Sequence, residues 1–371
     1  MKNSLYIGVM SGTSLDGVDI ALVSITKNDI SFKLGHTYQI PDNIKSDLLT
    51  ICEQKQSSLQ KLGEIDHQLG ELYATAINNF IKNNQINKKN IVAIGCHGQT
   101  IYHSPTGHYP FTMQIGDANI IAARTGITTI ADFRRRDVAL GGQGAPLVPA
   151  FHNAIFHNPN KNRVILNIGG ISNITVLTPN KPIIGYDTGP GNVLLDSWIM
   201  ANLNKSYDHD AIWAKTGNIN QPLLDQLLQE YYFEQPYPKS TGRELFNLSW
   251  LKQKVSKFNL SPQDIQATLV ELTVRSTVNE LLNKQLLDPS LPCELLICGG
   301  GAKNPLIIER FSKLLVNWLV NTTDQHGISG DYMEAIAFAW LAYCRMNNLV
   351  SNIPSVTGAT KSVSLGVIYP S

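Results

Sequence analysis

The chain has 371 residues, of which 43% are hydrophobic and 16% charged, and its formal net charge is +1. This length predicts about two domains with sizeable cores, and the near-neutral charge gives no reason to expect a nucleic acid or a membrane as partner. No apolar run is long enough for a membrane span, and the first apolar run is too brief for a signal peptide. The five cysteines form no CxxC pair, which is typical of reduced thiols, so we expect a cytoplasmic protein.

A strand, a turn and a second strand open the chain. The apolar runs 5–10 and 18–25 flank a turn at 11–17 that is rich in glycine, serine and threonine. In the second run, apolar residues share one face at the period of two that a strand requires. A small-residue tip of this kind exposes backbone N–H groups and hydroxyls, which bind phosphate. The alternative is a plain hairpin turn.

The first half of the chain then alternates helical and strand patterns. Apolar residues recur every three or four positions over 62–80, which predicts an amphipathic helix. The short apolar strands 91–94 and 127–130 run into small polar loops at 95–100 and 131–137. This is the α/β arrangement in which ligands meet the carboxyl ends of strands.

The opening pattern occurs a second time about 160 residues later, as strand 164–168, turn 169–172 and strand 173–178. An internal repeat of this length predicts two similar α/β domains. We place them at residues 1–155 and 156–371.

A third glycine-rich turn, 299–304, follows the apolar strand 295–298. Neither the GxxxxGK[ST] loop nor a G-x-G-x-x-G fingerprint is present, and each turn alone is weak evidence. In this order, however, the three turns resemble the actin, Hsp70 and sugar-kinase superfamily. That resemblance implies two actin-like (ribonuclease H-like) domains with ATP in the cleft between them. The implied nucleotide-binding residues are Gly12, Thr13, Ser14, Leu15, Asp16, Gly17, Val18 and Asp19, then Gly169 and Gly170 for phosphate, and Gly299 and Gly300 for adenosine.

A longer set of motifs resembles the anhydro-N-acetylmuramic acid kinase family. The motifs span residues 9 to 342 and read VMSGTSLDGVD, GCHGQT, ADFRRRDVALGGQGAPLVPAFH, LNIGGISNIT, GYDTGPGNVLLDSW, KSTGRELFN, ICGGGAKN and YMEAIAFAWLA. The resemblance implies an enzyme of peptidoglycan recycling that takes 1,6-anhydro-N-acetylmuramic acid, cleaves its internal bridge with water and phosphorylates O6 with ATP. The product is N-acetylmuramic acid 6-phosphate. The resemblance also implies a homodimer.

Such a reaction needs a carboxylate that takes a proton from water. The family motif places this catalytic aspartate at Asp187, and the alternative is that Asp187 caps the Gly/Pro turn after it. Glu334, at the start of an otherwise apolar helix, is the second candidate, unless it only complements the helix dipole. Phosphoryl transfer is usually supported by Mg²⁺. Asp16 or Asp19 would hold that ion through water, or merely fix the hairpin, and we assign no metal ligands.

The lactyl carboxylate of the sugar should meet an arginine. If the strand pattern continues through 134–136, Arg134 and Arg136 face one way and Arg135 the other, so either that pair or Arg135 alone meets the substrate. The alternative is that these arginines form salt bridges with Asp132 and Asp137. His97 and Gln99 would bind sugar hydroxyls or the acetamido group, and the loop 141–149, with Gly144, would form a platform for the sugar.

Two other functions remain open on the residues alone. An ordinary sugar kinase of the same fold would phosphorylate an open-ring sugar without hydrolysis. A nucleotide-gated filament or peptide-binding protein, like actin or Hsp70, would hydrolyse ATP slowly without any sugar. Only the motif resemblance selects the anhydro-sugar kinase.

Overall fold

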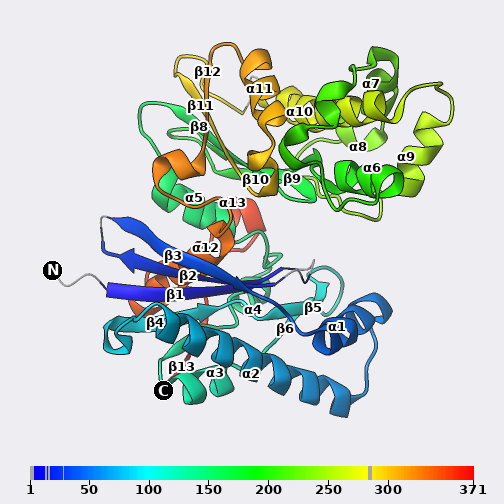
Figure 1. The fold of residues 1–371 in the computed structure, drawn as a ribbon. Helices are drawn as coiled ribbons and strands as arrows, with labels where there is room; N and C mark the ends of the chain where they lie inside the picture. Colours follow the sequence, from blue (N-terminus) through cyan, green and yellow to red (C-terminus); the bar gives the residue numbers. More distant parts are fainter. Residues whose placement is uncertain (1–3, 13–14, 16, 28, 283–285) are drawn as a thin grey trace. The chain divides into compact units, whose positions relative to one another are not determined.

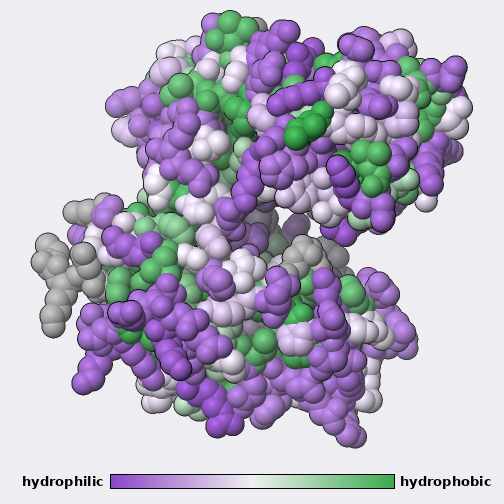
Figure 2. Space-filling view, viewed as in Figure 1, coloured by the Kyte–Doolittle hydropathy of each residue, from purple (hydrophilic) through white to green (hydrophobic). Residues whose placement is uncertain are grey.

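The computed structural model describes residues 4–12, 15, 17–27, 29–282 and 286–371. The chain divides into unit 1, Met1–Ile155 with Tyr332–Ser371, and unit 2, Phe156–Asp331 (Figure 1). Within the described residues, no helix is both long and apolar enough to cross a membrane. On the face drawn in Figure 2 polar side chains predominate, and apolar ones form small scattered patches.

Unit 1 is built on a mixed sheet with the strand order β13-β7-β4-β1-β2-β3. Strands β1, β2 and β3 are antiparallel neighbours, β4 is parallel to β1, and β7 is parallel to β4. A separate hairpin joins β5 and β6. The strands are β1 (Ser4–Ser11), β2 (Val18–Ile25), β3 (Ile30–Tyr38), β4 (Ile91–Cys96), β5 (Gln99–Ser104), β6 (Phe111–Ile115), β7 (Thr129–Ala131) and β13 (Val367–Tyr369). The helices are α1 (Asp42–Gln54), α2 (Leu59–Asn83), α3 (Ala118–Thr125), α4 (Arg135–Ala139), α5 (Val148–Phe156), α12 (Met333–Met346), α13 (Pro354–Thr357) and the 3-10 turn Lys88–Asn90.

The two faces of β1 are covered by different helices. Ile7 and Val9 belong to the same buried cluster as the apolar stripe of α2, which confirms the predicted amphipathic helix. Alternate residues of a strand point to opposite faces, so Gly8 faces the other way, toward α12. There a Cβ atom on Gly8 would stand 1.7 Å from the carbonyl oxygen of Ala335. The missing side chain is therefore what lets α12 pack directly on the sheet.

The predicted extent of the second domain, 156–371, is wrong at its carboxyl end. Residues 332–371 return to unit 1, where α12 packs on β1, β2 and β4. Gly95 of β4, which pairs with Gly8 across the sheet, completes the flat surface that receives the helix. The repeat pattern could not reveal this packing because it describes only the start of each domain.

Unit 2 has a mixed sheet with the order β10-β9-β8-β11-β12. Its strands are β8 (Asn162–Ile168), β9 (Ile171–Leu177), β10 (Ile184–Pro190), β11 (Cys293–Cys298) and β12 (Trp318–Thr322). Its helices are α6 (Val193–Leu203), α7 (Gln221–Leu228), α8 (Tyr231–Glu234), α9 (Leu248–Val255), α10 (Pro262–Leu281) and α11 (Pro305–Leu314), with 3-10 turns at His209–Ala211, Ala214–Thr216, Gly300–Lys303 and Thr323–His326.

The two units share one topology. In each, three antiparallel strands are followed by two parallel ones, as β3-β2-β1-β4-β7 in unit 1 and β10-β9-β8-β11-β12 in unit 2. The repeated hairpins predicted from the sequence are β1–β2 and β8–β9. The predicted fold class, α/β with two related actin-like domains, is confirmed.

Candidate active site

The first predicted phosphate segment is the tip of the β1–β2 hairpin. Thr13, Ser14 and Asp16 of this segment lie outside the described residues. The backbone N–H of Leu15 donates to the carbonyl of Gly12 at 3.1 Å, and the Leu15 side chain is buried. Beyond Gly17, β2 begins at Val18, and the carboxylate of Asp19 accepts a hydrogen bond of 2.6 Å from the Thr37 hydroxyl. The described ends of the segment are thus anchored, and its role in phosphate binding stays a prediction.

The second predicted phosphate segment is the Gly169–Gly170 turn between β8 and β9. Its two carbonyls accept hydrogen bonds of 2.8 to 3.1 Å from the backbone N–H groups of Gly191, Asn192 and Val193, where α6 begins. The N–H groups of Gly169 and Gly170 themselves donate to none of the described residues. Unpaired N–H groups in a tight turn, next to the positive end of a helix, form a site that favours anions.

The third glycine turn lies against the base of the second. Gly299 has a φ of +78°, and a Cβ atom there would stand 2.4 Å from Oδ1 of Asn167 and 2.8 Å from the carbonyl oxygen of Ile168. A side chain at this position would force the turns apart. Gly300 lies next to Asn192, with an ordinary contact distance of 3.6 Å between a Cβ position and Nδ2. Unit 2 therefore brings Gly169, Gly170, Gly299 and Gly300 together.

Asp187 lies on β10, opposite Asn173 of β9. Its Oδ2 accepts hydrogen bonds from the hydroxyl of Ser240 at 3.0 Å and from the backbone N–H of Thr241 at 3.1 Å. Its Oδ1 accepts none from the described residues. The side chain therefore binds the 240–241 loop instead of capping the turn that follows it, and one carboxylate oxygen stays open to accept a proton.

Burial raises the pKa of Asp187 above its ordinary value, and the charge of Glu244 adds to the rise. The hydrogen bonds from Thr241 and Ser240 oppose it. A raised pKa makes the carboxylate a better proton acceptor near neutral pH.

A buried ion pair fixes the backbone around Asp187. Nζ of Lys239 lies 2.6 Å from Oε1 of Glu280, and the hydroxyl of Tyr186 donates to Oε2 of the same carboxylate at 2.9 Å. The Asp187 backbone joins this network, because its N–H donates to the Lys239 carbonyl and its carbonyl accepts from the Tyr232 hydroxyl. Hydrogen bonds at both the N–H and the carbonyl of Asp187 thus tie β10 to the neighbouring segment that carries Tyr232 and Lys239.

In unit 1, the structure brings His97, Arg134 and Gly144 together. Arg134 donates from Nε and Nη2 to Nε2 of His97, at 3.1 and 3.0 Å, and from Nη1 to the Gly144 carbonyl at 2.7 Å. A guanidinium only donates, so Nε2 is the acceptor. Burial and the charge of Arg134 hold the pKa of His97 well below its usual range, so the ring is neutral. Burial also lowers the pKa of Arg134 to about 10, and Glu334 opposes that shift.

Glu334 lies in the first turn of α12 and its side chain is exposed. Desolvation by the surrounding protein raises the pKa of Glu334. The positive charge of Arg134 opposes this rise, and the negative charge of Asp19 adds to it. Glu334 thus interacts electrostatically with Arg134 and Asp19, which also belong to unit 1. A site role and a helix-dipole role both remain compatible with this placement.

Two predicted sugar contacts have other partners. Gln99 is buried, and its Oε1 accepts a 2.8 Å hydrogen bond from the Ser11 hydroxyl while its amide donates to the Thr100 carbonyl. Arg136 donates to the Ser364 carbonyl at 2.8 Å. The expectation that the strand pattern continues through 134–136 is wrong, because this segment opens α4, and successive side chains turn around a helix instead of alternating.

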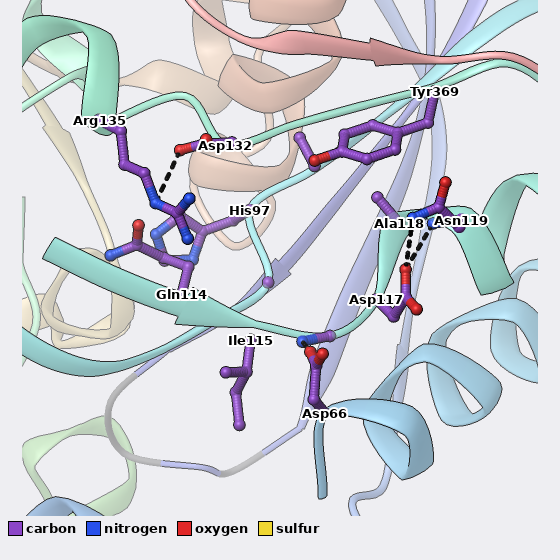
Figure 3. Close-up of a pocket in the computed structure, with 13 residues that line it drawn as sticks. Asp66, His97, Gln114, Ile115, Asp117, Ala118, Asn119, Asp132, Arg135 and Tyr369 are labelled. Atoms are coloured by element: carbon purple, nitrogen blue, oxygen red, sulfur yellow. Dashed lines mark hydrogen bonds and ion pairs between the residues drawn. The ribbon is translucent and has the colours of Figure 1, made fainter. Parts of the chain in front are cut away.

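A cavity of about 170 Å³ lies where β4 and β7 end in unit 1 (Figure 3). Arg135 reaches it and lies 3.6 Å from the carboxylate of Asp132, the salt bridge considered as an alternative. His97 lines the same cavity, with Gln114 and Tyr369. Arg135 is therefore the arginine of the 134–136 segment that this cavity exposes.

The comparison with known families tests the family predicted from the motifs. The family profile described as anhydro-N-acetylmuramic acid kinase matches residues 4–371. The chain belongs to the anhydro-N-acetylmuramic acid kinase family. The family predicted from the motifs is confirmed, and with it the prediction that the chain is a kinase.

Members of the anhydro-N-acetylmuramic acid kinase family match over the whole chain. The relative of that name from Actinobacillus pleuropneumoniae serotype 5b (strain L20) is 57% identical over 371 residues, covering 100% of both chains. The one from Vibrio cholerae serotype O1 is 54% identical over 368 residues, covering 99% of each. Among solved structures, the activator of the 2-hydroxyisocaproyl-CoA dehydratase from Clostridium difficile aligns over 91% of this chain and 94% of its own, with 11% identity and a TM-score of 0.45.

The sequence reasoning assigned no role to Arg243, which the structure places beside the β8–β9 turn. Arg243 belongs to the 239–246 loop that binds Asp187, and its Nη2 lies 3.9 Å from the position of a Cβ atom on Gly170. The signal was present in the motif KSTGRELFN, but nothing in the motif shows that its arginine reaches the β8–β9 turn.

No group of three or more His, Cys, Asp or Glu side chains that could hold a metal ion occurs within the described ranges. The polar side chains of Asn167 and Asn192 approach the glycine turns of unit 2. Oxygen donors with few carboxylates suit Mg²⁺, which keeps several waters and takes further ligands from phosphates.

Proposed function

We propose that this protein is an ATP-dependent kinase that opens the anhydro bridge of 1,6-anhydro-N-acetylmuramic acid with water and phosphorylates O6. The products would be N-acetylmuramic acid 6-phosphate and ADP. The observation that carries the proposal is the full-length family match, together with Asp187 at the position of the family's catalytic aspartate, with one oxygen unpaired among the described residues.

Asp187 would act on water. Its Oδ1 takes a proton as the water oxygen attacks C1, and the C1–O6 bond breaks with its electrons going to O6. O6 then attacks the terminal phosphorus of ATP, and the bond from that phosphorus to the bridging oxygen breaks toward ADP. The raised pKa supports proton acceptance, and general-base catalysis of this kind contributes about 10²- to 10⁴-fold.

The glycine turns of unit 2 would hold the nucleotide. The N–H groups of Gly169 and Gly170, which have no acceptor among the described residues, would donate to phosphate oxygens, and Gly299 and Gly300 would border the adenosine. Asp16 or Asp19 would hold Mg²⁺ through water, and the ion would neutralise charge on the phosphates. The hairpin tip at Gly12–Asp19 would supply the second phosphate contact.

Unit 1 would hold the sugar where β4 and β7 end. Arg135 is the arginine we assign to the lactyl carboxylate, because it lines the cavity while Arg134 donates to His97 and Gly144 and Arg136 donates to Ser364. Arg134 would instead keep His97 neutral and in place beside the sugar.

The cellular setting follows from the substrate. A sugar released by peptidoglycan turnover and a need for ATP suit an enzyme of cell-wall recycling in the cytoplasm. The homodimer implied by the family resemblance stays a prediction, which light scattering on the purified protein would test.

Isotope labelling tests the reaction. With ATP and the anhydro sugar in ¹⁸O water, we expect the label on the anomeric hydroxyl of the product and none in the phosphate. Asp187→Asn should lower kcat by about 10²-fold or more with ATP binding intact. An unlabelled anomeric position, or equal turnover of the open-ring sugar, would instead indicate an ordinary sugar kinase. ATP hydrolysis that does not respond to any sugar would indicate an actin-like or Hsp70-like function.

A further inference from the structure

Arg243 is an exposed arginine whose guanidinium makes no hydrogen bond or ion pair with any described residue. We propose that Arg243 contacts the terminal phosphoryl group of the nucleotide and stabilises the charge that develops as this group is transferred. The inference rests on the proposed kinase function and assigns a residue to it.

The position of Arg243 beside the β8–β9 turn is the first support. Its Nη2 lies 3.9 Å from where a Cβ atom on Gly170 would stand, at the same distance as Cβ of Val193. The guanidinium therefore lies beside Gly170 and close to Val193, the first residue of α6, at the turn whose N–H groups donate to none of the described residues. Cation, free N–H groups and helix terminus all favour a phosphate at one place.

The anchoring of the loop is the second support. At one end Lys239 is buried in its ion pair with Glu280, and at the other Phe246 is fully buried in the core of unit 2. The carbonyl of Gly242 accepts hydrogen bonds from the N–H groups of Leu245 and Phe246, at 3.2 and 3.1 Å. Arg243 thus projects from a loop that is held at both ends.

The same loop also holds the proposed base. Ser240 and Thr241 donate to Oδ2 of Asp187, and Arg243 follows two residues later. One rigid segment would therefore position the group that takes a proton from water and the group that binds the phosphoryl oxygens. Such shared positioning is what a transfer between a sugar oxygen and phosphorus requires.

No acidic side chain of the described residues forms an ion pair with Arg243. Asp196, half-buried in the first turn of α6, attracts the guanidinium, yet the two form no ion pair within 4 Å. Glu244 is its neighbour in the loop and is exposed. Arg243 would donate hydrogen bonds to the phosphoryl oxygens. Preorganised donors of this kind act where charge develops during transfer.

Nucleotide discrimination tests the proposal on the full-length protein. We would measure Kd for ADP and for a non-hydrolysable ATP analogue in the wild type, Arg243→Ala and Arg243→Lys. Loss of a contact to the terminal phosphoryl group should weaken the analogue by about 10-fold or more in Arg243→Ala and leave ADP within about twofold. We expect kcat to fall by about 10²-fold or more, with partial recovery in Arg243→Lys or when free guanidinium is added.

Lys252→Ala, on the exposed side of α9, is the matched control for removing a positive charge from unit 2. Thermal melting of each variant reports whether it is folded. A folded Arg243→Ala that keeps the wild-type preference for the ATP analogue and the wild-type kcat would overturn the proposal. Failure of the wild type to phosphorylate the anhydro sugar would overturn the proposed function instead. The nucleotide-binding assay of the variants and the sugar-phosphorylation assay of the wild type therefore distinguish the two failures.

Discussion

The hydroxyl of Ser240 donates a hydrogen bond to Oδ2 of Asp187 across 3.0 Å. This bond stabilises the ionised carboxylate and opposes the increase in pKa that burial causes. Burial therefore raises the pKa of Asp187 while hydrogen bonds lower it. Removing a hydrogen bond should raise this pKa, and reducing the burial should lower it.

Ser240→Ala should raise the pKa of Asp187 further, because the ionised form loses a donor. We expect the acidic limb of kcat/KM to move to higher pH by about half a unit to one unit, with little change in kcat on the plateau. The pH profile of the steady-state rate measures this. Ser256→Ala, in which the lost hydroxyl only donates to the Gln253 carbonyl, should leave the limb unmoved. A shift toward lower pH would contradict the assignment of Asp187 as the base.

Arg135→Ala should raise KM for the anhydro sugar by about 10- to 100-fold and leave KM for ATP unchanged, because a cation that meets the lactyl carboxylate is lost. Arg136→Ala is the matched control, since its guanidinium donates to the Ser364 carbonyl. A sugar analogue without the carboxylate should bind both variants and the wild type alike. Equal sugar KM values in Arg135→Ala and the wild type would remove Arg135 from the substrate contacts.

Gly95→Ala should destabilise unit 1 by about 3 kcal/mol, because the new methyl group would stand 2.0 Å from the Phe338 carbonyl oxygen of α12. Gly63→Ala is the opposite case. Gly63 is exposed within α2, and a Cβ atom there meets nothing within 4 Å, so we expect about 0.5–1 kcal/mol of stabilisation. Urea unfolding of both variants measures the difference. A Gly95→Ala protein as stable as the wild type would refute the close packing of α12 on β4.

Asp196 should make stability depend on pH. Burial raises its folded pKa to about 6, while an unfolded aspartate titrates near 3.9. The folded state therefore holds the proton more tightly, so the stabilisation is present below about pH 4 and is lost as the pH rises through about 6.

Asp196→Asn should therefore be more stable than the wild type at pH 8, by about 1–2 kcal/mol, and nearly equal to it at pH 4. Thermal unfolding at the two pH values measures this difference. Asp225→Asn is the control, because it makes the same change from carboxylate to amide at an exposed position of α7. A gain that is the same at both pH values would show that titration of Asp196 is not its cause.

The sequence alone determined the local features. The period of two in 18–25, the strand–turn–strand pattern of 164–178 and the helical stripe of 62–80 each predicted an element that the structure contains. These patterns succeed because neighbouring residues fix strand faces, turn conformations and helix stripes. The family motifs added the fold class and the kinase assignment, which are confirmed, and the prediction that Asp187 is the base.

Only the tertiary structure decided which distant segments meet. Gly8 and Gly95 receive α12 and bring residues 332–371 back to unit 1, Gln99 bonds to Ser11 inside the protein, and Arg243 lies beside Gly170. These contacts join residues that are 70 or more positions apart, and the period of a strand or helix carries no information about such partners. Backbone packing against glycines that lack a Cβ atom sets the contact of α12 with the sheet, and side chains that the fold brings together make the other two.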